Sequence, residues 1–460
     1  MGRMKKAAAV VVVLAAVGIG VGIGGGHLLS QQRAAISADD AEKKFDLTNA
    51  ELIKQGAYIA RTADCVACHT APGGQDYAGG LAMETPLGAI YSTNITPDPE
   101  TGIGNYSFAD FKRAVKHGVT PDNRPLYPAM PYPSYVIMPD EDIAAMYAYF
   151  MSDVKPVVHK NGDSTIPWPL DMRWPMSWWQ LLFAPDRDFV ADPKLSELEN
   201  RGAYLIEGPG HCGACHTPRG LAYEEKSMAM KDHDVNNAFL SGAVIDGWRA
   251  KSLRAEARGL ASWSQDDLEM FFKTGRTDVV AAFGAMGEVV EHSTRYMTNE
   301  DIRAMAAYLK QLPPAKDKIL EFEPKEDITT AALQAGTDHS RGALLYVENC
   351  MVCHRADGQG IPRIFPALAG NSAIFAKNPQ STIQVTLEGG KMPSNDIDVM
   401  DFAMPAFNHL STDDIVEVLN FIRNGWTNQA PKVTAKEVDH IKDFLAGKSP
   451  HLVHAGETHE

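Results

Sequence analysis

All six cysteines of this 460-residue chain lie in three copies of one pattern, Cys-x-x-Cys-His. The copies are CVACH from Cys65, CGACH from Cys212 and CMVCH from Cys350. Such a pair can be a redox disulfide, half of a zinc site or the attachment point of a haem, and only the haem needs the histidine directly after the second cysteine. A zinc site gathers four ligands around one metal, whereas these motifs lie more than a hundred residues apart with one histidine each. We therefore interpret them as three covalent haem c sites.

The chemistry of haem attachment explains the spacing within the motif. Each thiol adds to one vinyl group of the porphyrin, so the two cysteines must lie on one side of the ring edge, and the histidine then falls under the iron as the proximal ligand. The predicted attachment residues are Cys65, Cys68, Cys212, Cys215, Cys350 and Cys353, and the predicted proximal ligands are His69, His216 and His354.

A methionine follows each motif in a segment marked by proline or glycine, where we expect an irregular loop. The three are Met130 and Met404, each between alanine and proline, and Met286, between alanine and glycine. A thioether is a soft ligand that suits haem iron, and His/Met coordination raises the reduction potential and closes the sixth position. This ligand set favours electron transfer over the binding or activation of oxygen.

The three candidate methionines have rivals, because the chain has 19 methionines and most must fill the core. Met146 and Met305 occupy equivalent positions on the expected final helices and are predicted to be core residues. Met138 and Met297 lie just before those helices. Met392 precedes a proline in the third repeat and is the most serious rival. A loop position, which leaves the sulfur free to approach the iron, favours the three candidates.

The sequence around each haem motif also repeats. A helical pattern with a glycine precedes each copy, and an amphipathic helix with an Asp-Ile pair near its start ends each repeat. The glycines are Gly56, Gly202 and Gly342, and the pairs begin at Asp142, Asp301 and Asp414. We expect each glycine to let its helix cross the final helix closely, at Tyr149, Tyr308 or Phe421. Thr298 and Ser411 resemble the first residues of capping boxes, with aspartate in place of glutamate.

These repeats predict a mainly α fold: three tandem class I cytochrome c domains with covalently bound haem, preceded by an N-terminal hydrophobic helix. The predicted parts are a signal or membrane anchor at 1–30, domain 1 at 45–155, a Trp/Pro-rich linker at 156–195, domain 2 at 196–314, a linker at 315–335, domain 3 at 336–430 and a polar tail at 431–460. A domain of about a hundred residues is small for a free-standing core, so the porphyrin should supply much of the buried apolar surface.

The N-terminal segment begins with basic residues, followed by an uncharged apolar run from Ala7 to about Ile23. This order is typical of export, and the run is at the short edge of the length that spans a bilayer. An uncleaved anchor and a removed signal peptide are both open alternatives, and both place the body outside the cytoplasm. The glycines from Gly20 match G-x-G-x-x-G, but that motif needs a βαβ unit around it, so we do not expect a nucleotide site here.

Composition and the missing motifs limit the function further. The formal charge of -15, without any stretch rich in lysine and arginine, argues against a nucleic-acid partner. The chain has no flavin-binding signature in its strand and helix context, no G-x-S-x-G and no spare cysteine, so we expect no catalytic residues. Six other histidines have no metal-type spacing: His117, His159, His233, His292, His339 and His409.

The linker between the first two domains is rich in tryptophan and proline, with Trp168, Trp174, Trp178 and Trp179. Aromatic-rich surface commonly marks a protein interface or the headgroup layer of a membrane. The alternative is a buried strap that packs against the neighbouring domains. The sequence leaves both interpretations open.

Five further segments carry a resemblance to a known family. They are YSTNITPDPETGIGNYSFADFKRAVKHGV from Tyr91, LYPAMPYPSY from Leu126, IPWPLDMRWP from Ile166, AFGAMGEVVEHST from Ala282 and FAMPAF from Phe402. Over nearly all of residues 45–428 the chain resembles the three-haem cytochrome c subunit of membrane-bound alcohol, gluconate, sorbitol, fructose and related dehydrogenases of acetic acid bacteria and other proteobacteria.

The resemblance implies a non-catalytic subunit that accepts electrons from a catalytic subunit and passes them through three haems to ubiquinone in the respiratory chain. It supports Met130, Met286 and Met404 as distal ligands. It also implies a place at the periplasmic face of the bacterial inner membrane, a catalytic partner that holds FAD or PQQ, and room for a small third subunit.

The type of catalytic partner is the least determined part of this expectation. The linker and the NITPD segment favour an FAD-dependent sugar, polyol or sugar-acid dehydrogenase of the gluconate 2-dehydrogenase type. The alternatives are a PQQ-dependent alcohol dehydrogenase (quinone) and a molybdenum aldehyde dehydrogenase. A multihaem peroxidase, which needs an open sixth position on one iron, and a haem subunit of a terminal oxidase are further rivals.

Overall fold

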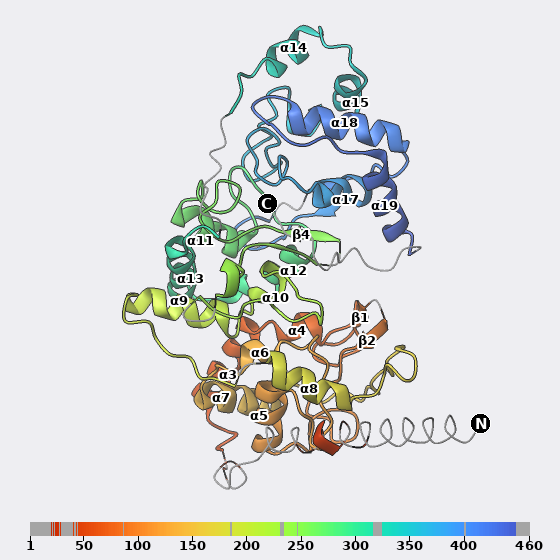
Figure 1. Cartoon of the computed structure of the whole chain (residues 1–460). Helices are drawn as coiled ribbons and strands as arrows, with labels where there is room; N and C mark the ends of the chain where they lie inside the picture. The colour runs from red at the N-terminus through yellow and green to blue at the C-terminus, as the bar shows by residue number, and fades with distance from the viewer. Residues whose placement is uncertain are drawn as a thin grey trace, which may run out of the picture. The chain divides into compact units, whose positions relative to one another are not determined.

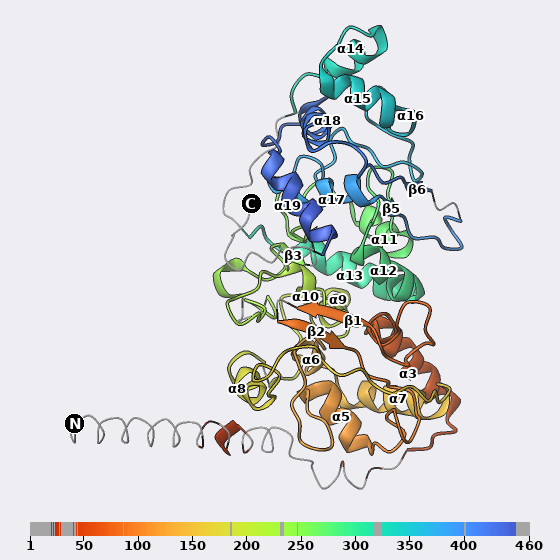
Figure 2. The ribbon, with the colours of Figure 1, turned by 90° about the vertical axis from the view of Figure 1, so that its right-hand side faces the viewer.

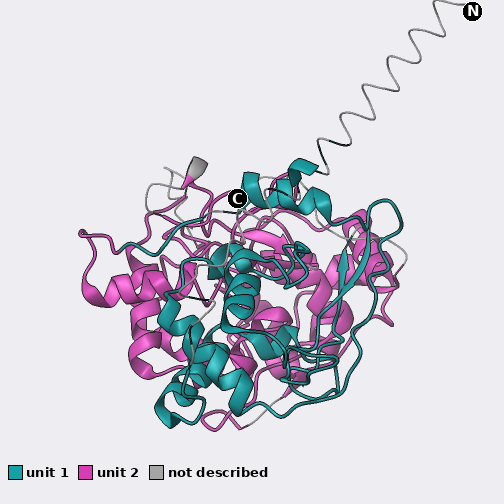
Figure 3. Ribbon diagram, turned by 90° about the horizontal axis from the view of Figure 1, so that it is seen from below, with its two compact units in different colours: residues 1–190 teal, residues 191–460 magenta. Residues whose placement is uncertain are grey.

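The chain forms two compact units, residues 1–190 and residues 191–460 (Figure 3). The computed structural model describes residues 20, 22, 24–26, 28, 40, 43, 45–85, 87–184, 186–230, 234–245, 247–315, 324–399 and 402–447. The first unit contains the first haem motif, and the second unit contains the other two. The second and third repeats therefore share one compact body.

The first unit is mainly helical, as predicted, with one short hairpin (Figure 1). Its elements are α3 (Ala50–Thr62), α4 (Cys65–Cys68), β1 (Ala82–Thr85), β2 (Gly88–Tyr91), α5 (Phe108–His117), α6 (Tyr132–Tyr135), α7 (Asp140–Ser152) and α8 (Trp174–Phe183). Strands β1 and β2 pair antiparallel, with Ala82 opposite Tyr91. Helix α5 begins with a capping box between Ser107 and Asp110, which satisfies amide groups of its first turn.

The second unit contains the other two repeats; the second repeat has its strands before the middle helix, as the first does, and the third has them after it. Its helices are α9 (Glu197–Glu207), α10 (Gly213–His216), η1 (Val235–Asn237), α11 (Gln265–Thr274), α12 (Ala285–His292), η2 (Thr294–Tyr296), α13 (Asn299–Gln311), α14 (Thr329–Ala335), α15 (Arg341–Asn349), α16 (Met351–His354), α17 (Gln380–Glu388), α18 (Thr412–Asn424) and α19 (Ala435–Leu445). Its strands form two antiparallel pairs, β3 (Ala243–Ile245) with β4 (Trp248–Ala250) and β5 (Gly390–Lys391) with β6 (Ala403–Met404).

In each repeat the first and last helices cross at a glycine, and this confirms the prediction from the sequence. A Cβ atom on Gly56, Gly202 or Gly342 would lie 2.8 Å from the Cβ of Tyr149, Tyr308 or Phe421, respectively. The crossing pairs are α3 with α7, α9 with α13 and α15 with α18. Any side chain larger than hydrogen at these glycines would push the two helices apart.

The aspartates of the final helices have a second function besides helix capping. Thr298 and Ser411 accept the amide hydrogens of Asp301 and Asp414, as in the first half of a capping box. The carboxylate of Asp301 instead binds Arg201 on α9 through two contacts of 2.8 and 2.9 Å. In the third repeat, the carboxylate of Asp414 likewise lies 2.8 Å from an arginine on α15. These ion pairs link the same helices that cross at the glycines.

Residues 431–460, which we expected to be a polar tail, include a packed helix. Helix α19 begins at a capping box formed by Thr434 and Glu437, and it buries Val438 and Ile441 in the core of the third repeat. Figure 2 shows α18 beside α15 and α19, and α18 packs against both. The 11-residue helix is amphipathic, although its composition is mostly polar, because it buries Val438 and Ile441 on one face.

The predicted N-terminal anchor lies largely outside the described residues. Within the parts of the chain that the structure describes, no helix is long and apolar enough to cross a membrane. One described contact joins the segment to the linker helix: Trp178 Nε1 donates to the carbonyl oxygen of Gly22 at 3.0 Å.

Candidate haem-binding sites

The three motif histidines make the same hydrogen bond. The ring Nδ1 of His69 lies 2.6 Å from the carbonyl oxygen of Thr93, that of His216 2.7 Å from Lys251, and that of His354 3.0 Å from Pro366. A carbonyl oxygen can only accept, so Nδ1 carries the proton and Nε2 keeps the lone pair that a metal needs. Each histidine is therefore held in the tautomer that ligates through Nε2.

Desolvation keeps these three imidazoles neutral. Burial lowers the pKa of His69, His216 and His354, and the pKa of His216 falls to about 4. Only the neutral imidazole binds a metal ion, so burial and the carbonyl contact both prepare the ring for ligation.

The hairpins supply the accepting carbonyl in the first two repeats. Thr93 follows β2 by two residues, and Lys251 directly follows β4. In the third repeat the carbonyl comes from a loop, where a bridge between Ile361 and Phe365 turns the chain just before Pro366. Sequence analysis missed all three acceptors, because a backbone carbonyl is present at every residue and leaves no signature in residue type.

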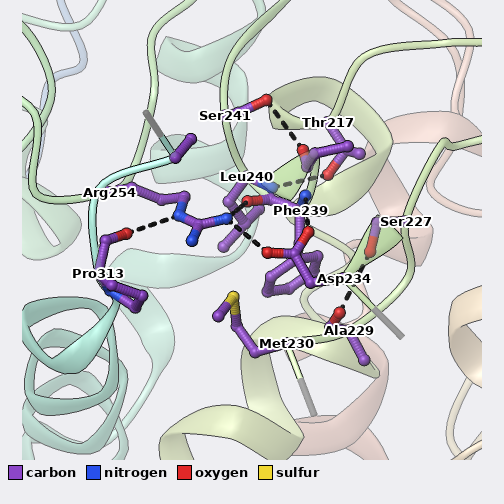
Figure 4. Close-up of polar contacts among 12 residues, drawn as sticks. Thr217, Ser227, Ala229, Met230, Asp234, Phe239, Leu240, Ser241, Arg254 and Pro313 are labelled. Carbon is purple, nitrogen blue, oxygen red and sulfur yellow. Dashed lines mark hydrogen bonds and ion pairs between the residues drawn. The ribbon is translucent and has the colours of Figure 1, made fainter. Parts of the chain in front are cut away.

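A buried ion pair fixes the loop that positions His216. Figure 4 shows the guanidinium group of Arg254, three residues after Lys251, between Asp234, Phe239 and Pro313. Its Nη1 lies 2.7 Å from the Asp234 carboxylate, and its Nε donates to the Pro313 carbonyl at 2.7 Å. Arg254 is only 1% exposed. These contacts anchor the Arg254 side chain close in sequence to the Lys251 carbonyl.

The cysteines of each motif lie beside the histidine on a short helical turn. All six are half-buried. Before haem attachment, desolvation raises the pKa of the Cys65, Cys212 and Cys350 thiols, the latter two to about 12. Among the described residues, no three His, Cys, Asp or Glu side chains are grouped as a metal site would require.

The candidate methionines differ from their rivals in burial. Met130, Met286 and Met404 are all half-buried, like the motif cysteines and histidines. The rivals are almost fully buried: Met138, Met146, Met297, Met305 and Met392 are at most 3% exposed. Met404 packs against the same hydrophobic core as Cys350. Met392 is followed by Pro393, which lies beside Gly275 and Gly287 of the second repeat. Burial therefore separates the candidates from the core residues.

The expected loop position of the methionines is only partly correct. Met130 lies in a turn, where its amide donates to the Tyr127 carbonyl at 3.3 Å. Met286 instead lies in the first turn of α12, and Met404 ends the short strand β6. The helix continues through the buried Gly287, whose amide donates a hydrogen bond to the carbonyl of Gly284 at 2.8 Å.

The tryptophan-rich helix α8 covers the segment that carries Met130. Trp179 is buried with Tyr132, and Met130 packs against this cluster. Gln180 donates from its side chain to the carbonyl of Gly118 at 2.9 Å. The linker is thus a strap over this segment on one face, while Trp168, Leu181 and Leu182 on the other side are 79%, 52% and 69% exposed.

We expect Trp179→Ala to destabilise the first unit by about 3 to 5 kcal/mol, since it empties the contact between α8 and the Met130 segment. Trp168→Ala is the matched control: the side chain is exposed, and its removal should change stability by less than about 0.5 kcal/mol. Urea unfolding followed by near-ultraviolet circular dichroism measures both changes. Equal effects of the two substitutions would contradict a strap function for α8.

Comparison with known proteins agrees with this geometry. The cytochrome c family model matches residues 53–153 and 339–426, the first and third repeats. The cytochrome c subunit of alcohol dehydrogenase (quinone) from Gluconacetobacter polyoxogenes is 48% identical over 85% of this chain and 84% of its own length. This chain belongs to the family of cytochrome c subunits of dehydrogenase complexes. The gluconate 2-dehydrogenase cytochrome c subunit of Pantoea cypripedii is 47% identical, over 86% of this chain and 91% of its own length.

A more distant relative extends the family to another substrate. The fructose dehydrogenase cytochrome subunit of Gluconobacter japonicus is 34% identical, over 86% of this chain and 83% of its own length. As a cytochrome c subunit, this protein carries covalent haem c and transfers electrons, and it works with a catalytic dehydrogenase subunit. The groups of each motif fit haem c: two thiols and an imidazole whose Nε2 is available to a metal.

Proposed function

We propose that this cytochrome c subunit binds three haem c groups and relays electrons one at a time from its catalytic subunit to ubiquinone. One observation carries the proposal: the hydrogen bond from a motif histidine to a backbone carbonyl occurs in all three repeats. A chance Cys-x-x-Cys-His sequence would not place its histidine in the same tautomer three times.

Each residue of a site has a separate function in this proposal. The thiols of Cys65 and Cys68, and their equivalents, hold the porphyrin covalently. His69, His216 and His354 would ligate the iron through Nε2, and Met130, Met286 and Met404 would supply the second ligand through their thioether sulfurs. The haem supplies a reversible one-electron couple of its iron. The protein excludes water, holds the imidazoles neutral and orients the ligands.

We further propose that the subunit works at the periplasmic face of the inner membrane in the respiratory chain. Its catalytic partner would be an FAD-dependent dehydrogenase for a sugar, polyol or sugar acid. The 47% identity to a gluconate 2-dehydrogenase subunit favours this partner, and the 48% identity to an alcohol dehydrogenase (quinone) subunit favours a PQQ-dependent one equally well. The partner's cofactor must therefore be measured.

The number of haems can be measured directly. The purified protein should contain three haems per chain by the alkaline pyridine assay. We expect the variant with Cys212→Ala and Cys215→Ala to contain two, because only the second site loses its thioether bonds. The matched control, Cys350→Ala with Cys353→Ala, should also contain two. A native protein with fewer than three haems would refute the three-site proposal.

The partner is identified from the native complex. Gentle solubilisation of the membranes, followed by isolation of this subunit with the proteins that hold it, would release FAD or PQQ from the catalytic subunit. FAD would support the proposed partner, and PQQ would replace it with an alcohol dehydrogenase. Carbon monoxide tests the rival peroxidase function, because a reduced haem with an open sixth position binds it and three methionine-ligated haems should not.

A further inference from the structure

The second and third repeats contact each other through the residues that precede Met286. The backbone of Val279, seven residues before Met286, accepts a hydrogen bond from the amide of Ala367 at 2.9 Å. The Arg276 guanidinium donates to the carbonyl of Arg363 at 3.1 Å. These contacts join the two repeats within one compact unit.

One aromatic ring lies directly between the two methionine segments. Phe283 precedes Met286 by three residues, and its ring packs on Gly390: a Cβ atom there would lie 2.6 Å from Phe283 Cδ1. Gly390 is paired with Met404 in the β5–β6 ladder. The missing side chain at 390 thus makes room for a ring from the neighbouring repeat, beside the backbone opposite the third methionine.

The segment that carries Met286 also contacts the hairpin of its own repeat. Gly284, with φ +57°, leaves space for the ring of Trp248, whose Cε2 would lie 2.5 Å from a Cβ atom at 284. Trp248 begins β4, the strand that leads to the carbonyl acceptor of His216. Gly287 lies beside Pro393: a Cβ atom at 287 would lie 3.7 Å from the Pro393 Cγ. The segment from 282 to 287 therefore packs between the β3–β4 hairpin of the second repeat and the β5–β6 ladder of the third repeat.

We propose that Phe283 is a positioning residue that couples the methionine ligands of the second and third haems. This inference rests on the proposed ligands. Because the ring touches the ladder of Met404 and belongs to the segment of Met286, a displacement of one segment must move the other. Contacts around the ligands tune their orientation and the reduction potential of the metal, so the two sites respond together.

The test is the methyl signal of each ligand methionine in the full chain. A methionine bound to a reduced low-spin haem gives a strongly upfield methyl resonance, and ¹³C-methyl labelling separates it from the other methionines. We expect Phe283→Ala to shift or broaden the signals of both Met286 and Met404 while the signal of Met130 stays unchanged. Phe283→Leu, which keeps most of the contact, should cause smaller shifts at both signals.

Two comparisons make the result specific. Gly390→Ala pushes against the ring from the third repeat and should shift the same two signals. Phe271→Leu is the control in the second repeat, since its ring packs on Trp263 of that repeat at 5.3 Å, and it should leave the Met404 signal in place. A response of Met286 alone, or of neither methionine, to all three changes at Phe283 and Gly390 would overturn the proposal.

Failure of the ligand assignment has a different signature. Met286→Leu and Met404→Leu should each remove one upfield methyl signal. If all three signals persist in either variant, the proposed ligand is wrong, whatever Phe283 does. If Phe283→Ala does not fold, Phe283→Leu and Gly390→Ala still decide between a coupled and a local effect.

Discussion

Gly202→Ala is expected to lower the free energy of unfolding of the second unit by about 3 kcal/mol, because the new methyl group has no space. A Cβ atom at 202 would lie 2.0 Å from the carbonyl oxygen of Ala304, in the final helix of the repeat. The obstacle is backbone, so no side-chain rotation can relieve the contact. Helices α9 and α13 must separate, and urea unfolding followed by circular dichroism should show a lower midpoint.

The same substitution in the other repeats gives a graded series. At Gly56 the distance to the Ala145 carbonyl oxygen is 1.9 Å, and at Gly342 the distance to the Glu417 carbonyl oxygen is 2.6 Å, so the third repeat should be the least affected. Gly336→Ala is the control: it has open space and φ +64°, and only backbone strain of about 1 kcal/mol is expected. If Gly202→Ala costs no more than Gly336→Ala, close helix crossing is not what requires glycine.

Arg254→Met should destabilise the second unit by about 3 to 5 kcal/mol, since it leaves Asp234 buried without its partner. Asp234 is largely buried, and Arg254 Nη1 also donates to the carbonyl oxygen of Phe239 at 3.2 Å. The loss should reach His216 as well, because the Lys251 carbonyl loses the support of the residue three positions later. Chemical denaturation measures the first effect, and the reduced spectrum of the second haem reports the second.

A double variant separates the lost pair from the buried charge. With Asp234→Leu added to Arg254→Met, no charge is left without a partner, so part of the stability should return. The exposed pair of Arg341 and Asp414 is the control: the arginine side chain is 54% exposed, and Arg341→Met should cost at most about 1 kcal/mol. If the double variant is less stable than Arg254→Met, the unpaired Asp234 carboxylate is not the main cause of the lost stability.

Several features could be predicted from the sequence because they depend on residue types at short spacing. The Cys-x-x-Cys-His motifs predict covalent haem from five consecutive residues, and family membership supports this cofactor. The pairing of each glycine with an aromatic residue was also predictable, and it is confirmed in all three repeats. The repeats made it visible, because the same two positions recur at matching places in three copies.

Other parts of the site depend on contacts between residues far apart in the chain. The carbonyls that orient the histidines, the pairing of Asp234 with Arg254 and the packing of Phe283 on Gly390 have no pattern in residue type. Helix α19 and the helical position of Met286 were missed because tertiary packing overrode the local polar or glycine signal. The sequence by itself determined the chemistry at each motif and the close helix crossings. Only the tertiary structure decided the orientation of the ligands, since orientation comes from backbone groups and neighbours that folding brings together.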